Sequence, residues 1–483
     1  MKKQHPIAVL KYTTGYFWLL LIPLLRGLSA LKGDVYSWVR GAYIDIFILM
    51  IITLIAVIRW SSIRFEIGNS GLILYSGYFV KEKICIPFYA VSAVRTEKSF
   101  YLRPFRAVKL SIETAADNFK RDSKNNGLVL VLPLKLYTEI CDKLTYKNIA
   151  PHWEYEASKA KLLSFCITIS STITGLAYAG TILMHGSRVA DLQLEKKIAD
   201  AAESAIGYAE KVSGGFSVYA GWAVGAAAFG WMFSFASNYL RHVNFKMTRQ
   251  GKSIITQGGF FSKWSCIMRS EKIIYTDMRQ NLLMKIFGLV TVMISCCGYG
   301  KGKGEIPLAV PSGDKESAGR IIEKFIPQFC YVPVETRVKG CSVLRYVGLP
   351  VMMIFGIIFG GGAAVIFFPS WHRLILFCSV MGMIFTAHLY IVNLTAFCTS
   401  GAGIKGDNAN LRYCRFFQFH NVTVPLKKIV MTEMRQSIFQ KRKNVCDLIV
   451  YTGFGMIKKH RVKGIDVCEA GVFTDRINYR KGR

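Results

Sequence analysis

The chain has 483 residues and a formal net charge of +32, from 62 Lys and Arg residues against 30 Asp and Glu residues. Hydrophobic residues make up 52% and charged residues only 19%, which excludes wholesale disorder and argues against a ribosomal or histone-like chain. The excess of basic residues predicts an anionic partner, either nucleic acid or a membrane surface.

Six apolar stretches follow one another along the chain, and the last four contain no Asp, Glu, Lys or Arg. An α-helix needs about 20 apolar residues to cross the hydrocarbon core of a bilayer. We therefore expect six membrane-spanning helices, with buried core helices of a soluble protein as the alternative. The stretches are Ala8–Leu25, Ala42–Ile58, Leu162–Met184, Gly215–Leu240, Val347–Phe368 and Leu374–Phe397.

Basic residues are concentrated in alternate segments between these stretches. The segments 59–161, 239–346 and 398–483 contain 17 Lys and Arg residues each, whereas the intervening loops are poor in them. The positive-inside rule then places these three segments and both termini in the cytoplasm of a multi-pass cell-membrane protein. None of the 13 cysteines lies in a predicted outer loop, which agrees with a reducing compartment and no disulfides.

The three soluble segments repeat one another in sequence. Ile273–Gly298 in the second segment aligns with Ile429–Gly453 in the third, so that Thr276, Met278, Arg279 and Gln280 match Thr432, Met434, Arg435 and Gln436. The first segment is more divergent and has Glu97 and Lys98 at the Arg-Gln position. Each segment alternates apolar and polar residues between glycine turns and ends in one helical pattern, which predicts an antiparallel β-sandwich or barrel capped by a C-terminal helix.

Glycine turns at Gly71, Gly77, Gly251 and Gly258, followed by "IPFYAVSAV", "IMRSEKIIYTDMRQ" and "VPLKKIVMTEMRQ", carry a resemblance. The chain resembles the bacterial pleckstrin-homology (PH) membrane family of YdbT-like proteins. The resemblance implies a multi-pass helical membrane protein with three cytoplasmic β-rich PH-like domains, each preceded by a transmembrane hairpin, and no established catalytic activity. The PH fold is associated with phosphoinositide or protein binding.

These observations give expected domain boundaries. The predicted parts are hairpin 1 (1–58), PH-like domain 1 (59–161), hairpin 2 (162–240) with an outer amphipathic helix (186–212), PH-like domain 2 (241–343), hairpin 3 (344–397) and PH-like domain 3 (398–483).

The sequence contains no motif for catalysis or for metal binding: no C-x-x-C, no H-E-x-x-H and no phosphate-binding loop. The Gly-rich run Gly298–Gly304 precedes a predicted strand rather than a helix, which favours a β-turn. We therefore expect a non-enzymatic protein without a cofactor, a metal or a small-molecule substrate. Nucleic acid is disfavoured because the basic segments lack a dedicated binding motif.

Clustered basic residues are the candidates for binding anionic lipid or a partner. Their alternative role is to set topology and to solvate exposed faces. Arg279 and Arg435 recur at one repeat position, which suits a structural hydrogen bond as well as a binding site. A further basic run, Lys458–Lys463, follows. The candidates are Arg269, Lys272, Arg279, Lys285, Lys427, Lys428, Arg435, Lys441, Arg442 and Lys443.

Two polar residues fall inside apolar stretches, Asp45 and His388. Ionisable residues within a membrane are candidates for function, although Asp45 also suits the outer interface and His388 also suits helix packing. The predicted function is that of a membrane scaffold in the cell envelope or in stress resistance, which contacts the anionic inner leaflet, a membrane-protein partner or further copies of itself. The alternative is a transporter or channel that uses the six helices and Asp45.

Overall fold

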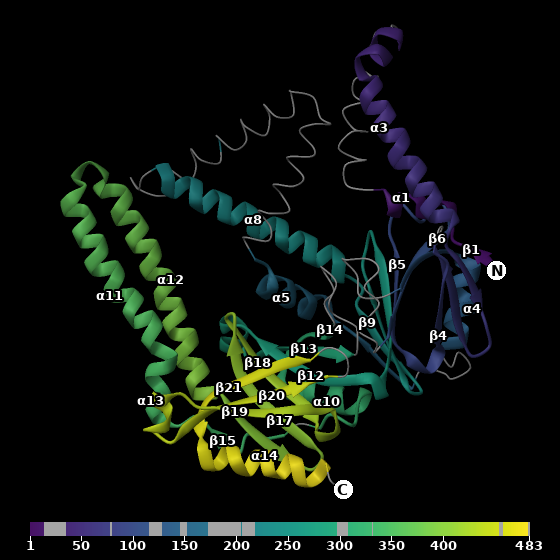
Figure 1. Ribbon diagram of the computed structural model, residues 1–483. Helices are drawn as coiled ribbons and strands as arrows, with labels where there is room; N and C mark the ends of the chain where they lie inside the picture. The colour runs from purple at the N-terminus through teal and green to yellow at the C-terminus, as the bar shows by residue number, and fades with distance from the viewer. Residues whose placement is uncertain are drawn as a thin grey trace.

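The computed structural model describes residues 1–13, 35–77, 80–114, 128–144, 152–171, 204, 218–296, 308–330, 332–453 and 457–481. The predicted amphipathic helix 186–212 and most of the stretches Ala8–Leu25 and Leu162–Met184 lie outside the described residues. Three β-rich domains of the same design follow one another along the chain (Figure 1). In each, a 3-10 turn separates an N-terminal group of strands from a C-terminal group of three, and a helix follows.

The first domain ends in the amphipathic helix α4, which places Ile140 fully inside the domain core. The strand Ala107–Thr114 alternates apolar and polar residues, as expected for a sheet with one buried face, whereas Leu128–Pro133 is apolar throughout. The elements are β1 (Lys2–Lys3), η1 (Pro6–Ala8), α1 (Val9–Tyr12), α3 (Val35–Ser61), β2 (Arg64–Ile67), β3 (Gly71–Ser76), β4 (Glu82–Pro87), η2 (Phe88–Ala90), β5 (Val91–Lys98), β6 (Ala107–Thr114), β7 (Leu128–Pro133) and α4 (Leu134–Leu144).

The second domain repeats this order and closes with α10, whose buried face is Ala318, Ile322 and Phe325. The i, i+4 and i+7 spacing of these residues places them on one side of the helix. The elements are β8 (Trp153–Glu156), α5 (Lys159–Ile169), α8 (Val218–His242), β9 (Lys246–Gln250), β10 (Ser253–Gly258), β11 (Lys263–Arg269), η3 (Ser270–Lys272), β12 (Ile273–Gln280), α9 (Leu282–Ile286), β13 (Leu289–Cys296), β14 (Leu308–Asp314) and α10 (Lys315–Phe325).

The third domain is closed by α14, which buries Ala470, Phe473 and Ile477. The elements are β15 (Thr336–Arg337), η4 (Gly340–Ser342), α11 (Val343–Phe367), η5 (Pro369–Trp371), α12 (His372–Thr399), β16 (Gly401–Lys405), β17 (Asn408–Arg415), β18 (Gln418–Pro425), η6 (Leu426–Lys428), β19 (Ile429–Arg435), α13 (Ile438–Lys441), β20 (Val445–Thr452), β21 (Lys458–Asp466) and α14 (Val467–Lys481).

Neighbouring domains share continuous β-sheets. Strand β5 of the first domain pairs antiparallel with β11 of the second, giving a seven-stranded sheet of order β7-β6-β5-β11-β10-β9-β8. Strand β12 of the second domain pairs with β18 of the third in a second seven-stranded sheet, β14-β13-β12-β18-β17-β16-β15. The end sheets are β1-β2-β3-β4 and β19-β20-β21. The three domains are therefore joined by backbone hydrogen bonds as well as by the chain.

The hydrophobic cores cross the same junctions. Ala93 of β5 belongs to the core cluster of the second domain, with Cys266 and Met268 of β11. Ile274 and Tyr275 of β12 belong to the core cluster of the third domain. The second and third domains thus complete their cores with side chains from a strand of the domain before them.

The order of hairpins and domains differs from the one expected. The first strand of each domain precedes the helical segment instead of following it: β1 pairs with β2, β8 with β9, and β15 with β16. The strand Trp153–Glu156, which the predicted boundaries assign to domain 1 (59–161), therefore belongs to the sheet of the second domain. Such short strands have too few residues to show a periodic pattern in the sequence.

Among the described residues, two helices are long and apolar enough to cross a membrane, Gly340–Phe367 and Leu374–Thr399. They match the last two of the six predicted stretches and form a hairpin of α11 and α12 that projects from the third domain (Figure 1). Helix α3 contributes a shorter apolar segment, Ile46–Ser61. The described residues therefore contain one hairpin of this kind, and the six-helix bundle stays a prediction.

Candidate anion-binding pocket beside the helical hairpin

Two of the four predicted basic residues of the second domain, Arg279 and Lys285, lie at its junction with the third. Arg279 donates from Nε to Asp277 Oδ2 at 2.6 Å. Lys285 lies 4.2 Å above the ring of Phe419 and donates to Thr399 Oγ1 at 3.2 Å. Arg269 and Lys272 are half-buried at the ends of β11 and η3. Arg279 and Lys285 thus have partners inside the junction.

Asp277 is the acidic centre of this junction. Its carboxylate is buried and contacts His420 Nδ1 at 2.9 Å in addition to Arg279. Burial alone would raise the pKa of Asp277, but the hydrogen bond with His420 and the charge of Arg279 lower it to about 2. At neutral pH the junction therefore holds an ionised carboxylate between two domains.

The predicted basic residues of the third domain lie in several separate places. Lys428 Nζ donates to the carbonyl oxygen of Glu271 at 2.7 Å, and Arg435 pairs with Glu433 on the same strand. Lys427 is exposed next to Lys428. A separate exposed group, Lys441, Arg442 and Lys443, lies at the C-terminal end of α13. The described structure does not gather the ten predicted residues into one pocket.

A different group of basic residues lines a cavity of about 500 Å³ between α12 and the third domain. Four of its lining residues are basic and none is acidic. They come from β17 and β21 and face Leu389, Val392 and Asn393 of the apolar helix α12. The basic residues are Arg415, Lys459, Arg461 and Lys463. In the sequence, the run Lys458–Lys463 was the only signal of this pocket.

The β17–β18 turn forms one wall of the pocket. Phe416 and Phe417 both have positive φ, of 49° and 62°, in a position that usually selects Asn and Gly. A left-handed conformation costs an L-residue about 1–2 kcal/mol. The ring of Phe417 lies 6.1 Å from Phe385 and 5.9 Å from His388, both on α12. The predicted polar residue His388 thus packs against the third domain.

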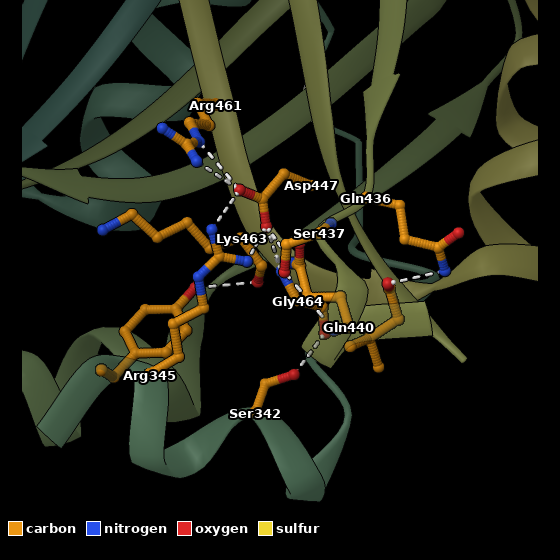
Figure 2. A network of polar contacts seen from close by, with 11 residues as sticks. Ser342, Arg345, Gln436, Ser437, Gln440, Asp447, Arg461, Lys463 and Gly464 are labelled. Carbon is orange, nitrogen blue, oxygen red and sulfur yellow. Dashed lines mark hydrogen bonds and ion pairs between the residues drawn. The ribbon is translucent and has the colours of Figure 1, made fainter. Parts of the chain in front are cut away.

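Asp447 joins this pocket to the hairpin of α11 and α12 (Figure 2). Its carboxylate is 1% exposed and accepts two hydrogen bonds from Arg345 of α11, at 2.5 and 2.7 Å. Arg461 of β21 donates two more to Oδ2, at 3.0 and 2.5 Å. Gln440 Nε2 and the backbone N–H of Gly464 complete the set at 2.9 and 3.2 Å. All its acceptor capacity is therefore used.

The backbone of β21 is also tied to the start of the hairpin. Ser342 Oγ donates to the carbonyl oxygen of Gly464 at 3.2 Å, and the Tyr346 hydroxyl donates to that of Lys463 at 3.0 Å. Gly464 has a φ of +73°, and a Cβ there would lie 2.5 Å from Ser342 Oγ. A glycine at this position lets the helix and the strand approach closely. Arg461 and Lys463 are thereby held beside α12.

The electrostatics of the pocket favour an anion. Desolvation lowers the pKa of Lys463, and repulsion by Arg461 and Arg345 lowers it further. A bound anion would offset that repulsion. Cys414 also lines the pocket, but burial raises the pKa of its thiol to about 11, so it is protonated at neutral pH. No group of three metal-ligating side chains occurs in the described part of the chain.

A sequence profile of the bacterial PH domain matches residues 17–140, 204–323 and 365–481. The chain belongs to the bacterial PH domain family. Over 401 residues it is 21% identical to the UPF0699 transmembrane protein YdbT of Bacillus subtilis (strain 168), an alignment that covers 80% of this chain and 79% of the relative. These matches confirm the resemblance predicted from the sequence. No solved structure matches the chain significantly.

Within this family framework, the pocket belongs to the third PH domain and to the hairpin inserted between its first two strands. The second intramembrane candidate, Asp45, is part of α3, and its side chain lies outside what the structure describes. A role for Asp45 in transport stays a prediction.

Proposed function

We propose that this chain is a multi-pass membrane scaffold without enzymatic activity, and that its third PH domain binds the headgroup of an anionic phospholipid. The observation that carries the proposal is the pocket of four basic and no acidic residues against the apolar helix α12. A phosphodiester needs cationic donors, whereas its acyl chains need an apolar surface. The pocket and α12 offer the two side by side.

The membrane part of the proposal rests on several observations. Two described helices have the length and composition of membrane spans, and the relative YdbT is named a transmembrane protein. The three PH domains carry most of the net positive charge, as expected for cytoplasmic segments. We therefore place the PH domains and both termini on the cytoplasmic side, where the leaflet is anionic.

The basic residues of the pocket differ in how firmly their charged groups are held. Arg461 is oriented by its hydrogen bonds to Asp447, so its guanidinium is held in a fixed position before a ligand arrives. Lys459 and Lys463 end in flexible ammonium groups that adjust to a phosphate. Preorganisation of the arginine lowers the entropy cost of binding. Phe416, which is 81% exposed at the turn, is placed to contact the acyl region.

The experiment measures lipids retained by the intact protein, purified in mild detergent and analysed by native mass spectrometry with added phosphatidylglycerol or phosphatidylcholine. We expect phosphatidylglycerol to be retained preferentially. Lys459→Gln with Lys463→Gln should weaken retention about 30-fold, because each juxtamembrane lysine contributes about 1 kcal/mol near an anionic lipid.

The matched control is Lys441→Gln with Lys443→Gln, which removes the same charge from an exposed site outside the pocket. This control should retain phosphatidylglycerol nearly as well as the unsubstituted protein. Equal losses in both double variants would show that overall charge, rather than the pocket, attracts the lipid. No preference for phosphatidylglycerol over phosphatidylcholine would remove the lipid function altogether.

A further inference from the structure

The two junctions between PH domains are built in the same register. In each domain, a strand, a three-residue 3-10 turn and a second strand follow one another: β4, η2 and β5; β11, η3 and β12; β18, η6 and β19. Aligning these turns makes Pro87, Arg269 and Pro425 equivalent. With this alignment the pair Val94↔Ile267 of the first junction corresponds to Thr276↔Thr423 of the second. The same pairing rule therefore operates twice.

The strands at the two ends of the molecule lack this pairing. Strand β19 is the third-domain equivalent of β5 and β12, and β4 is the first-domain equivalent of β11 and β18. Within the described residues, β4 and β19 are edge strands of their sheets. An edge strand presents backbone donors and acceptors that another strand can pair with. The chain thus carries both halves of a third junction, one at each end.

Side-chain exposure distinguishes β19 from its two equivalents. Met431 and Met434 of β19 are 50% and 45% exposed. The residues at the same repeat positions are Tyr275 and Met278 in β12, which are 4% and 8% exposed. In β5 they are Ala93 and Thr96, at 1% and 3%. Strand β19 is thus exposed at the positions where its equivalents β5 and β12 are covered by a neighbouring domain.

The other end offers the matching surface. Ile84 and Ile86 of β4 occupy the positions of Val422 and Val424 of β18, which lie in the core that Tyr275 enters. Cys85, between them, is exposed. Ile86 is buried in the core of the first domain and Ile84 packs against it, so β4 turns its apolar side inward as β18 does, and its backbone edge lies where the second and third domains receive their neighbours.

We propose that β19 of one copy pairs antiparallel with β4 of a second copy of this chain, in the register of the two internal junctions. In that register Thr432 lies opposite Cys85 of the second copy, and Arg435 lies opposite Glu82 of the second copy. Opposite charges at directly opposed positions of an antiparallel pair are favourable. Both edges and this charge match are present in one chain, which favours a second copy over an unrelated partner.

This contact is head-to-tail, because the two surfaces that meet belong to opposite ends of the molecule. Heterologous contacts of this kind continue from copy to copy and produce a ring if the rotation closes, or a filament if it does not. Each copy contributes three PH domains to one continuous series of shared sheets. The assembly would extend along the membrane to which the hairpins are anchored.

The test is a disulfide between copies. Directly opposed residues of an antiparallel pair have Cα atoms about 4.5–5.5 Å apart, which a disulfide spans. Thr432→Cys in the intact, membrane-embedded protein places a thiol opposite the natural Cys85. We expect mild oxidation to give a ladder of dimers and larger species, with a peptide linking residues 432 and 85 in mass spectrometry. Mixing copies that carry two different tags shows that the link joins separate chains.

Two controls separate the proposed pair from the other thiols. Thr432→Cys combined with Cys85→Ser should lose the ladder. Lys405→Cys, at an exposed position of β16, should not form a disulfide with Cys85 of another copy. Arg435→Glu and Glu82→Arg should each reduce cross-linking severalfold, and the chain that carries both should recover it. A monomeric protein by mass photometry, or a link from residue 432 to any other position, would overturn the proposal.

Discussion

Replacing Asp447 by Asn tests whether the buried carboxylate holds the hairpin of α11 and α12 to the third PH domain. Asn has nearly the same shape, but an NH2 group replaces one of the two carboxylate oxygens. It therefore cannot accept all of these hydrogen bonds, and it carries no charge to neutralise the two guanidinium groups. Arg345 and Arg461 would then keep their charge without a counterion in a site where the acid is 1% exposed. Removing one partner from a buried ion pair costs about 3–5 kcal/mol. The side chains of Arg345 and Arg461 are 33% and 39% exposed, so solvent screens part of this cost, and we expect a loss of stability at the lower end of that range.

Asp466→Asn is the matched control. Asp466 lies on the neighbouring strand β21 and pairs with Lys339 at 2.7 Å, but both side chains are solvated. Asn also preserves the hydrogen bond that Asp466 accepts from the N–H of Cys468 at the start of α14. Exposed pairs are screened by solvent and contribute little. The control should therefore unfold close to the unsubstituted protein.

The assay is urea unfolding of the intact protein in detergent, followed by tryptophan fluorescence, together with limited proteolysis of the segment between α12 and β21. Asp447→Asn should lower the unfolding midpoint and expose this segment to protease, whereas Asp466→Asn should change neither. Equal midpoints for the two variants would refute the view that the Asp447 contacts join hairpin and domain. A triple variant, Asp447→Leu, Arg345→Met and Arg461→Leu, should recover much of the loss, since no buried charge is left unpaired.

Two further predictions concern the same domain. Gly464→Ala should lower the melting temperature, because its left-handed φ alone costs about 1–2 kcal/mol and the new Cβ meets Ser342; adding Ser342→Gly should restore part of it, and no restoration would contradict the close contact. Burial lowers the pKa of His460 to about 4. As the pH falls, the imidazole is therefore protonated in the unfolded chain before it is protonated in the folded protein. The stability that this histidine contributes above pH 6.5 is lost between pH 6.5 and pH 4, by roughly 3 kcal/mol. His460→Gln, which keeps polar atoms for Tyr413 and Thr452, should flatten this dependence in unfolding curves from pH 7 to 4.5; an unchanged slope would assign the effect to another group.

Some of the architecture follows from sequence alone. Period-two alternation between glycine turns predicts the strands, and the pattern of "LKLYTEICDKL" predicts the helix that the structure has at Leu134–Leu144. The repeated Thr-x-Met-Arg-Gln string places Arg279 and Arg435 at one position of two like domains. These features are local, so neighbouring residues are enough to specify them.

The sharing of sheets between domains is not local. Strand β5 pairs with β11, which follows α5 and α8 in the sequence, and any strand with the same alternation of apolar and polar residues would fit the local pattern. Register and partner are decided by which side chains complete which core, as Tyr275 does in the third domain. For this reason the sequence predicts three domains but not their continuity.

The candidate pocket shows the same division. The sequence determined that this protein is strongly basic and that its basic residues avoid the apolar stretches. Only the tertiary structure decided which of them converge, because Arg415 on β17, Lys463 on β21 and Leu389 on α12 meet only when the hairpin packs on the domain. Asp447 sets that packing because it accepts hydrogen bonds from Arg345 of α11 and Arg461 of β21. One buried acidic residue produces no periodic pattern, so the sequence alone does not distinguish it from the other acidic residues.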